Sequence, residues 1–86
     1  MAAIGLVGAI ARAREELALF TQLPFDSVAS SQRLPDGGWL VVMDLIESAA
    51  RMGDNDLLAT YEVELGDAGE PTRIERIARY RREDQA

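Results

Sequence analysis

The chain has 86 residues, which is enough for one small domain spanning residues 1–86. It contains no cysteine and no histidine, and all nine of its basic residues are arginine. These absences exclude cysteine or histidine zinc sites, disulfide bonds, thiol nucleophiles, a histidine base and a Schiff-base lysine. Carboxylates, hydroxyls and arginines are left for chemistry, so the sequence predicts a protein that is not an enzyme and holds no cofactor or metal.

The charge is distributed unevenly along the chain. The formal net charge is −6, which disfavours non-specific binding to nucleic acid. The segment Thr72–Arg82 nevertheless holds five arginines and one glutamate, a local charge of +4, and the rest of the chain carries −10. Such a bipolar chain favours protein partners over polyanions. The alternative is that an edge strand simply directs these arginines into solvent.

Residues 1–10 form an apolar run with no basic residue before it. The run is shorter than the about 20 residues that a membrane span needs, and a charged helical segment follows it instead of a cleavage site. We therefore expect a cytoplasmic protein without a membrane partner. The arginine- and alanine-rich composition is typical of a high-GC bacterial gene.

The first predicted element is a helix over about residues 4–20. One apolar stripe runs along it at helical spacing, formed by Leu6, Ile10, Ala13, Leu17 and Phe20. Pro24 follows soon afterwards and ends the helical pattern.

Extended segments follow the helix. The sequence predicts a polar strand over about residues 28–34, a tight turn at Pro35–Gly38 and a strand over residues 39–48 that is apolar on nearly both faces. Apolar and polar residues alternate over residues 57–65, which predicts a half-buried antiparallel strand. The segment 73–82 fits a helix or a strand, and its strand-rich context favours a fourth strand.

These elements predict an α+β fold in which one N-terminal helix packs on a four-stranded antiparallel meander. We expect five sheet residues to contact the helical stripe, in particular its residues Leu6, Ile10, Leu17 and Phe20. The five are Trp39, Val41, Met43, Tyr61 and Val63. Such a small core is marginally stable, so we expect a homodimer or docking on a larger protein. The second apolar face of the strand 39–48, which includes Leu40 and Val42, is the predicted docking surface.

Two acidic patterns are candidate sites. Asp54-Asn55-Asp56 resembles the start of a calcium loop, but Ala59 and Leu65 stand where such a loop needs glycine and glutamate, so a capped turn is predicted. Glu62 and Glu64 share one strand face, with Asp44 or Glu47 as neighbours across the sheet. Paired carboxylates can serve acid–base hydrolysis in a pocket, whereas on a solvated face they pair with arginines such as Arg79 or Arg81.

The C-terminal segment provides the remaining candidate residues for partner binding. These are the cations and the aromatic residue of the last strand: Arg73, Arg76, Arg79, Tyr80, Arg81 and Arg82. They favour acidic protein partners. An aromatic residue interleaved with arginines can also stack on RNA bases, so a small regulatory RNA-binding module is the alternative function.

Several short motifs follow one another along the chain: Asp36-Gly37-Gly38-Trp39, the apolar strand that ends at Glu47, Leu58-Ala59-x-Tyr61-Glu62-Val63, Gly69-Glu70 and Arg79-Tyr80-x-Arg82. Their order and spacing resemble the gas vesicle synthesis protein O (GvpO) family over roughly residues 11–83. The resemblance implies a non-enzymatic accessory protein of gas vesicle assembly. It implies other gas vesicle accessory or shell proteins as partners, and a cytoplasmic location that includes association with the vesicles. It brings no catalytic residues.

Overall fold

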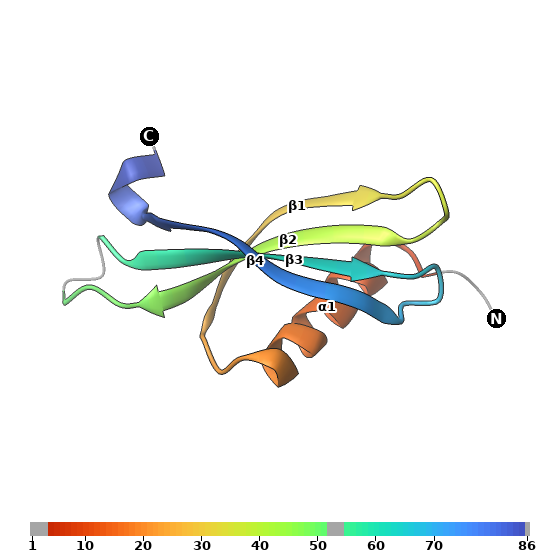
Figure 1. The fold of residues 1–86 in the computed structure, drawn as a ribbon, viewed down its shortest axis with the longest axis horizontal. Coiled ribbons are helices and arrows are strands. Elements are labelled where there is room, and N and C mark those ends of the chain that lie inside the picture. The colour runs from red at the N-terminus through yellow and green to blue at the C-terminus, as the bar shows by residue number, and fades with distance from the viewer. Residues whose placement is uncertain (1–3, 52–54, 86) are drawn as a thin grey trace.

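The computed structural model describes residues 4–51 and 55–85. Its elements are helix α1 (Leu6–Phe20), strands β1 (Phe25–Arg33), β2 (Trp39–Ser48), β3 (Leu57–Leu65) and β4 (Pro71–Arg81), and the short 3-10 helix η1 (Arg82–Gln85). The strands form one antiparallel sheet in the order β1-β2-β3-β4, and α1 lies against one face of it (Figure 1). The predicted α+β fold, one helix on a four-stranded antiparallel meander, is confirmed.

The bounds of two strands, β1 and β4, differ from the sequence prediction. β1 begins at Phe25, three residues before the predicted start. The cause is that Phe25 packs against the core opposite Leu45, and the Ile46 N–H donates a 2.8 Å hydrogen bond to the Pro24 carbonyl. The last segment is a strand, which begins at Pro71 and ends at Arg81.

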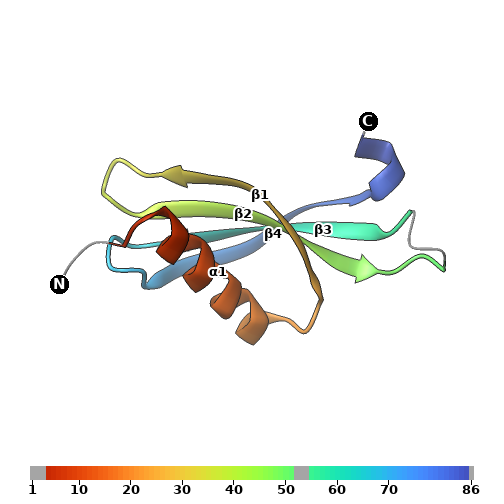
Figure 2. The same ribbon diagram turned by 180° about the vertical axis from the view of Figure 1, so that it is seen from behind.

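The sheet is strongly twisted along its length. In Figure 1 the strands are stacked in one vertical order at the end where α1 lies and in the opposite order at the other end. α1 therefore covers only one half of the sheet, near the β1–β2 and β3–β4 turns, as Figure 2 also shows from the other side. The N-terminal end of the chain lies at this covered half and the C-terminal end at the opposite half. The far half of the sheet must therefore be stabilised by other contacts.

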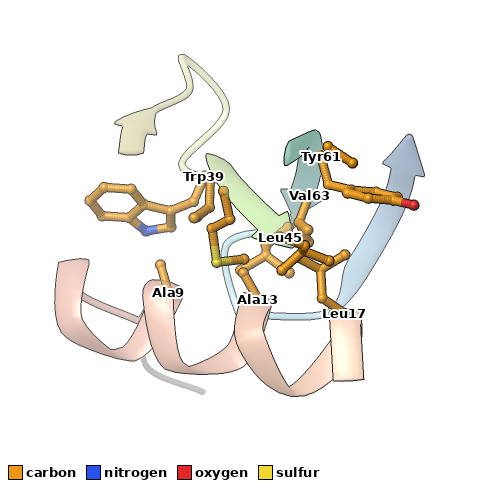
Figure 3. Close-up of a cluster of buried hydrophobic side chains, with 11 residues drawn as sticks. Ala9, Ala13, Leu17, Trp39, Leu45, Tyr61 and Val63 are labelled. Carbon is orange, nitrogen blue, oxygen red and sulfur yellow. The ribbon is translucent and has the colours of Figure 1, made fainter. Parts of the chain in front are cut away.

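The apolar core lies between α1 and the sheet (Figure 3). Its buried residues are Ala9, Ala13 and Leu17 of α1, with Trp39, Val41, Met43, Leu45, Ala59, Tyr61, Val63 and Leu65 of β2 and β3. β2 and β3 supply all of the fully buried sheet residues of this core, and Phe25 of β1 and Ile74 of β4 pack against it from the two sides.

The buried stripe of α1 differs from the predicted one. Leu17 and Ala13 are buried as expected, but Leu6 is 49% exposed and Phe20 is 57% exposed, so neither belongs to the buried core, although the expected contact of Phe20 with Tyr61 is present. Ala9 takes the place expected for Leu6, because a small side chain lets the helix approach the Trp39 ring closely (Figure 3).

The residues on either side of this stripe have their own contacts. Ile4, which precedes α1, packs against the core, and its carbonyl accepts a 3.2 Å hydrogen bond from Trp39 Nε1. Phe20 meets the Tyr61 ring edge-on, with 6.1 Å between the ring centroids. The two ends of α1 are thus anchored by aromatic side chains of the sheet, although Leu6 and Phe20 stay largely exposed.

The predicted turn between the first two strands is present. Gly37 has a φ of +91°, a conformation that glycine adopts without strain. The Asp36 carboxylate accepts a 2.9 Å hydrogen bond from the Gly38 N–H, and the Leu34 N–H donates to the Gly38 carbonyl at 2.8 Å. The turn chemistry in the sequence therefore fixes the β1–β2 connection.

Candidate functional site

The candidate arginines of β4 divide between the two faces of the sheet. Directly opposed residues of an antiparallel pair lie on the same face. Arg76 is opposite Tyr61 and Arg79 is opposite Ala59, and both partners belong to the core beneath α1. Arg81 continues this face opposite Leu57. We call Arg76, Arg79 and Arg81 the basic strip, which lies on the face of the sheet that α1 covers.

Glu47 partly neutralises the basic strip. It stands at a register shift of β2, and its carboxylate pairs with Arg79, whose Nε donates a 3.1 Å hydrogen bond, and with Arg76 at 3.8 Å. Both arginines remain about half exposed, so each pair stabilises the fold by only about 0–1 kcal/mol. The basic strip therefore keeps a net positive charge and access to solvent.

Arg73 lies on the opposite face and is surrounded by carboxylates. It pairs with Glu62 at 3.2 Å, with Glu64 at 3.4 Å and with Glu75 at 2.5 Å. The hydrogen bond with Glu62 is the main cause that raises the pKa of Arg73. Three acidic neighbours leave this arginine little attraction for a further acidic partner.

The surroundings of Glu62 and Glu64 correct part of the prediction. The expected arginine neighbours, Arg79 and Arg81, lie on the other face, and Arg73 takes their place. The residues opposite Glu62 and Glu64 on β2 are Val42 and Leu40, not Asp44 or Glu47. The cause is the register of β2 against β3, which sets Asp44 opposite Thr60. These glutamates therefore form a surface ion-pair group and not a carboxylate pair.

Tyr80 and Arg82 lie in a polar cluster that the sequence analysis missed. Tyr80 Oη donates a 2.7 Å hydrogen bond to Asp44 Oδ2, and Thr60 Oγ1 donates one of 2.7 Å to Asp44 Oδ1. Arg82 reaches both Asp26 at 2.8 Å and Asp56 at 3.1 Å. These contacts join all four strands on the face opposite α1. We call these six side chains (Asp26, Asp44, Asp56, Thr60, Tyr80 and Arg82) the polar cluster.

The polar cluster is largely removed from water. Asp44, Asp56 and Thr60 are buried, and Leu58, opposite Tyr80 in the sheet, is 1% exposed although it lies outside the main apolar core. Burial, followed by the bond to Asp44, raises the pKa of Tyr80 to about 12. This cluster supports the half of the sheet that α1 does not cover.

Asp56 has a capping role in the loop before β3. Its Oδ1 accepts a 2.7 Å hydrogen bond from the Ala50 N–H, and this bond, followed by the one from Arg82, lowers the pKa of Asp56. Asn55 Oδ1 accepts from the Glu83 N–H at 3.2 Å. Asp54, the first residue of the calcium-like motif, lies outside the described residues.

Leu40 and Val42 lie on the sheet face opposite α1. Both side chains are half-buried, and their neighbours across the strands are Glu64 and Glu62 on β3. The structure therefore places the two candidate apolar residues on a surface that is separate from the basic strip. The signal for the missed polar cluster was Asp44 itself, the one charged residue between Trp39 and Ile46.

Several kinds of site are absent from the described parts of the chain. Residues 4–51 and 55–85 hold no group of acidic side chains arranged for a metal ion. They also form no pocket. No helix among them has both the length and the apolar character needed to cross a membrane.

Comparisons with known proteins identify the family. The chain matches the family described as gas vesicle synthesis protein GvpO over residues 1–86. It is 33% identical to gas vesicle protein O of Haloferax mediterranei over 94% of the chain, and 39% identical to gas vesicle protein O of a Streptomyces species over 78% of it. It is 32% identical to gas vesicle protein O1 of Halobacterium salinarum over 92% of the chain. The chain belongs to the GvpO family, which confirms the resemblance found in the sequence.

The chain is shorter than these relatives. The matched region spans 58% of the Haloferax protein, 52% of the Streptomyces protein and 66% of the Halobacterium protein. No solved structure matches the chain. Membership in the family places the chain among proteins of gas vesicle synthesis.

Proposed function

We propose that this protein is a non-enzymatic accessory factor of gas vesicle assembly that acts by contacts with other gas vesicle proteins or nascent shell subunits. Family membership supports the process, and the surface of the sheet supports the mode of action. The protein works in the cytoplasm, either free or associated with the growing vesicle. The relatives carry additional residues beyond the matched region, so the proposal concerns the part that the GvpO match covers.

One observation carries the proposal: α1 packs on one face of the sheet, while Leu40 and Val42 are partly exposed on the other. Aliphatic side chains at the centre of a sheet face lose contact with water when a partner covers them, which stabilises the complex. The second apolar face of β2 is therefore the proposed docking surface.

The basic strip is proposed to serve the initial encounter with the partner. Arg76, Arg79 and Arg81 carry exposed charge, and long-range attraction accelerates encounter with an acidic partner and orients it. Arg73 and Arg82 contribute less, because each is already surrounded by carboxylates of the same chain.

The test is affinity capture of the tagged protein from cells that express its whole gene cluster, followed by identification of the bound proteins. The Leu40→Ser and Val42→Ser double variant is expected to lose captured gas vesicle proteins while remaining folded at the temperature of the capture. Val28→Ser, at an exposed apolar position of β1, is the matched control and is expected to capture normally. Equal capture by the double variant and the unmodified protein would remove this surface from the proposal.

The RNA-binding alternative stays a prediction with a separate test. Tyr80 donates to Asp44 and Arg82 binds two carboxylates, so neither side chain is arranged for stacking on a base. Retention on immobilised RNA that falls steeply with salt would favour the alternative, because released counterions give that dependence. Absence of retention at low salt would eliminate it.

A further inference from the structure

β4 is the longest strand of the sheet and lies at its edge. It has 11 residues, its side chains are mostly exposed, and within the described residues its backbone pairs only with β3. A long edge strand presents a row of unpaired N–H and C=O groups, and natural proteins usually keep such edges short. We propose that the free edge of β4 accepts an extended acidic segment of another gas vesicle protein as a fifth strand. This inference rests on the proposed function and specifies its basic strip.

The arrangement of the arginines indicates the chemistry of this segment. Alternate residues of a strand lie on one face, about 7 Å apart. A register shift in β4 places the extra residue Ile77 between Arg76 and Ala78. This bulge keeps Arg76 and Arg79 on the same face although they are three residues apart. The whole basic strip is therefore aligned on one side of the strand, where carboxylates at every second residue of an added strand would meet it.

The opposite face of β4 offers no comparable attraction. Arg73 there is paired with three glutamates, and Tyr80 is bound to Asp44. An incoming segment would therefore be selected by its side chains on the face that α1 covers. Main-chain hydrogen bonds would supply most of the affinity, since each exposed ion pair is individually weak.

The other edge of the sheet is less suited to this role. β1 has two register shifts, one after Phe25 and one after Val28, which interrupt a regular ladder. Its residues Ser27–Gln32 carry no charge, and its single arginine, Arg33, lies over the Trp39 ring, so this edge offers an acidic segment no row of cations. Asp26 at its start is already bound by Arg82. The difference between the two edges points to β4.

Glu47 lowers the net positive charge of the basic strip before a partner binds. Its carboxylate already neutralises part of the charge of Arg76 and Arg79. Carboxylates from an added strand would share these arginines with Glu47. Removing the Glu47 charge should therefore strengthen binding of an acidic segment, and this sign separates the proposal from a merely structural role of the ion pairs.

The experiment uses the full chain and a short synthetic peptide that alternates valine and glutamate. A second peptide has the same sequence with an N-methyl group on every residue, which keeps its charge but removes the N–H groups of both edges and so prevents strand pairing. A third replaces glutamate by lysine. Binding is measured by fluorescence anisotropy, and hydrogen exchange of the β4 amides reports whether a strand is added. We expect the first peptide to bind and to slow exchange at alternate β4 amides, and the other two to bind at least about tenfold more weakly.

Variants of the chain test which side chains select the peptide. Neutralising the basic strip with Arg76→Gln, Arg79→Gln and Arg81→Gln is expected to weaken binding at least about tenfold. Arg73→Gln, on the same strand but the other face, is the matched control and is expected to change binding little. Glu47→Gln is expected to tighten it.

The outcomes separate this inference from the proposed function. Equal binding of the plain and N-methylated peptides would overturn strand addition and leave only attraction by charge. No binding of any peptide, or equal effects of Arg73→Gln and the strip variant, would also overturn it. The proposed function fails separately, when capture from cells expressing the gene cluster recovers no gas vesicle protein.

Discussion

Tyr80 on β4 donates a 2.7 Å hydrogen bond to Asp44 on β2, across the intervening strand β3. Thr60 of β3 donates to the other oxygen of the same carboxylate, so one buried aspartate joins three strands. The C-terminal end of β4 is thereby held against the centre of the sheet.

Removing the Tyr80 hydroxyl should destabilise the fold. Tyr80→Phe leaves the buried Asp44 carboxylate with one donor fewer, and a hydrogen bond to a charged group contributes about 1.5–3 kcal/mol. Urea unfolding is expected to show a loss of about this size. Tyr61→Phe is the matched control, because the Tyr61 hydroxyl bonds to no other described residue. Equal losses in the two variants would contradict the assigned role of Tyr80.

The same contact predicts a loss of stability in alkali. The folded state raises the pKa of Tyr80 from its ordinary 10.0 to about 12, chiefly by burial. The neutral phenol is therefore favoured in the folded protein, and its contribution is complete below pH 10 and is lost as the pH rises towards 12. Absorbance titration of tyrosinate in a Tyr61→Phe background measures this pKa directly. A value near the ordinary one would show that the hydroxyl is hydrated.

Asp56 predicts a second pH dependence, of opposite direction. The Ala50 N–H, and then Arg82, lower the pKa of Asp56 below its ordinary value of 3.8. The carboxylate therefore contributes stability above pH 3.8 that is lost as the pH falls through its lowered pKa. Asp56→Asn should unfold more easily at neutral pH and lose less stability than the unmodified protein on acidification. Asp67→Asn, at an exposed turn position, is expected to behave like the unmodified protein in both measurements.

Two glycines should respond oppositely to a methyl group. A Cβ on Gly38 would clash with the backbone carbonyl of Leu65, which cannot move without disturbing β3, so Gly38→Ala should cost about 1–3 kcal/mol. A Cβ on Gly8, inside α1, would lie 3.6 Å from the Ile4 side chain, an ordinary contact. Gly8→Ala should raise stability by about 0.5–1 kcal/mol, because alanine favours the helix. Thermal unfolding of both variants decides between these signs.

Charge reversal on β4 should separate binding from stability. Arg79→Glu with Arg81→Glu reverses two exposed charges and removes only one weak surface pair, that of Arg79 with Glu47. We expect weaker partner capture and a nearly unchanged thermal transition. Arg33→Glu with Arg51→Glu makes the same change of charge outside β4 and serves as the control for capture; its thermal transition is expected to fall, because Arg33 lies over the Trp39 ring. Equal loss of binding and stability, or no loss of either, would argue against a steering role.

The fold could be predicted because its signals are local. The alternation of apolar and polar residues in β3 and the apolar residues on both faces of β2 predicted both strands and the burial of Tyr61 and Val63. The buried side of α1 was harder to predict, because the periodicity of apolar residues cannot rank Ala9 above Leu6. That choice depends on the size of the Trp39 ring opposite the helix, which is a property of the packed pair.

The candidate site could be predicted only as a set of residues. The sequence identified the arginines of β4, but a bulge at Ile77 decides which of them share a face. The polar cluster joins side chains separated by up to 56 positions, such as Asp26 and Arg82. No spacing rule along one strand relates such residues, because the pairing register and the twist of the whole sheet bring them together.

The sheet is stabilised on opposite sides at its two ends, by apolar packing beneath α1 and by ionic and hydrogen-bonded contacts around Asp44. Strong acid or alkali weakens mainly the second kind of contact, because protonation of Asp56 or ionisation of Tyr80 removes its hydrogen bonds, whereas the first depends on the removal of apolar surface from water. The stability of the two ends of the sheet therefore depends on different solvent conditions. Extremes of pH therefore loosen the C-terminal end, beside the basic strip, before they loosen the helical end.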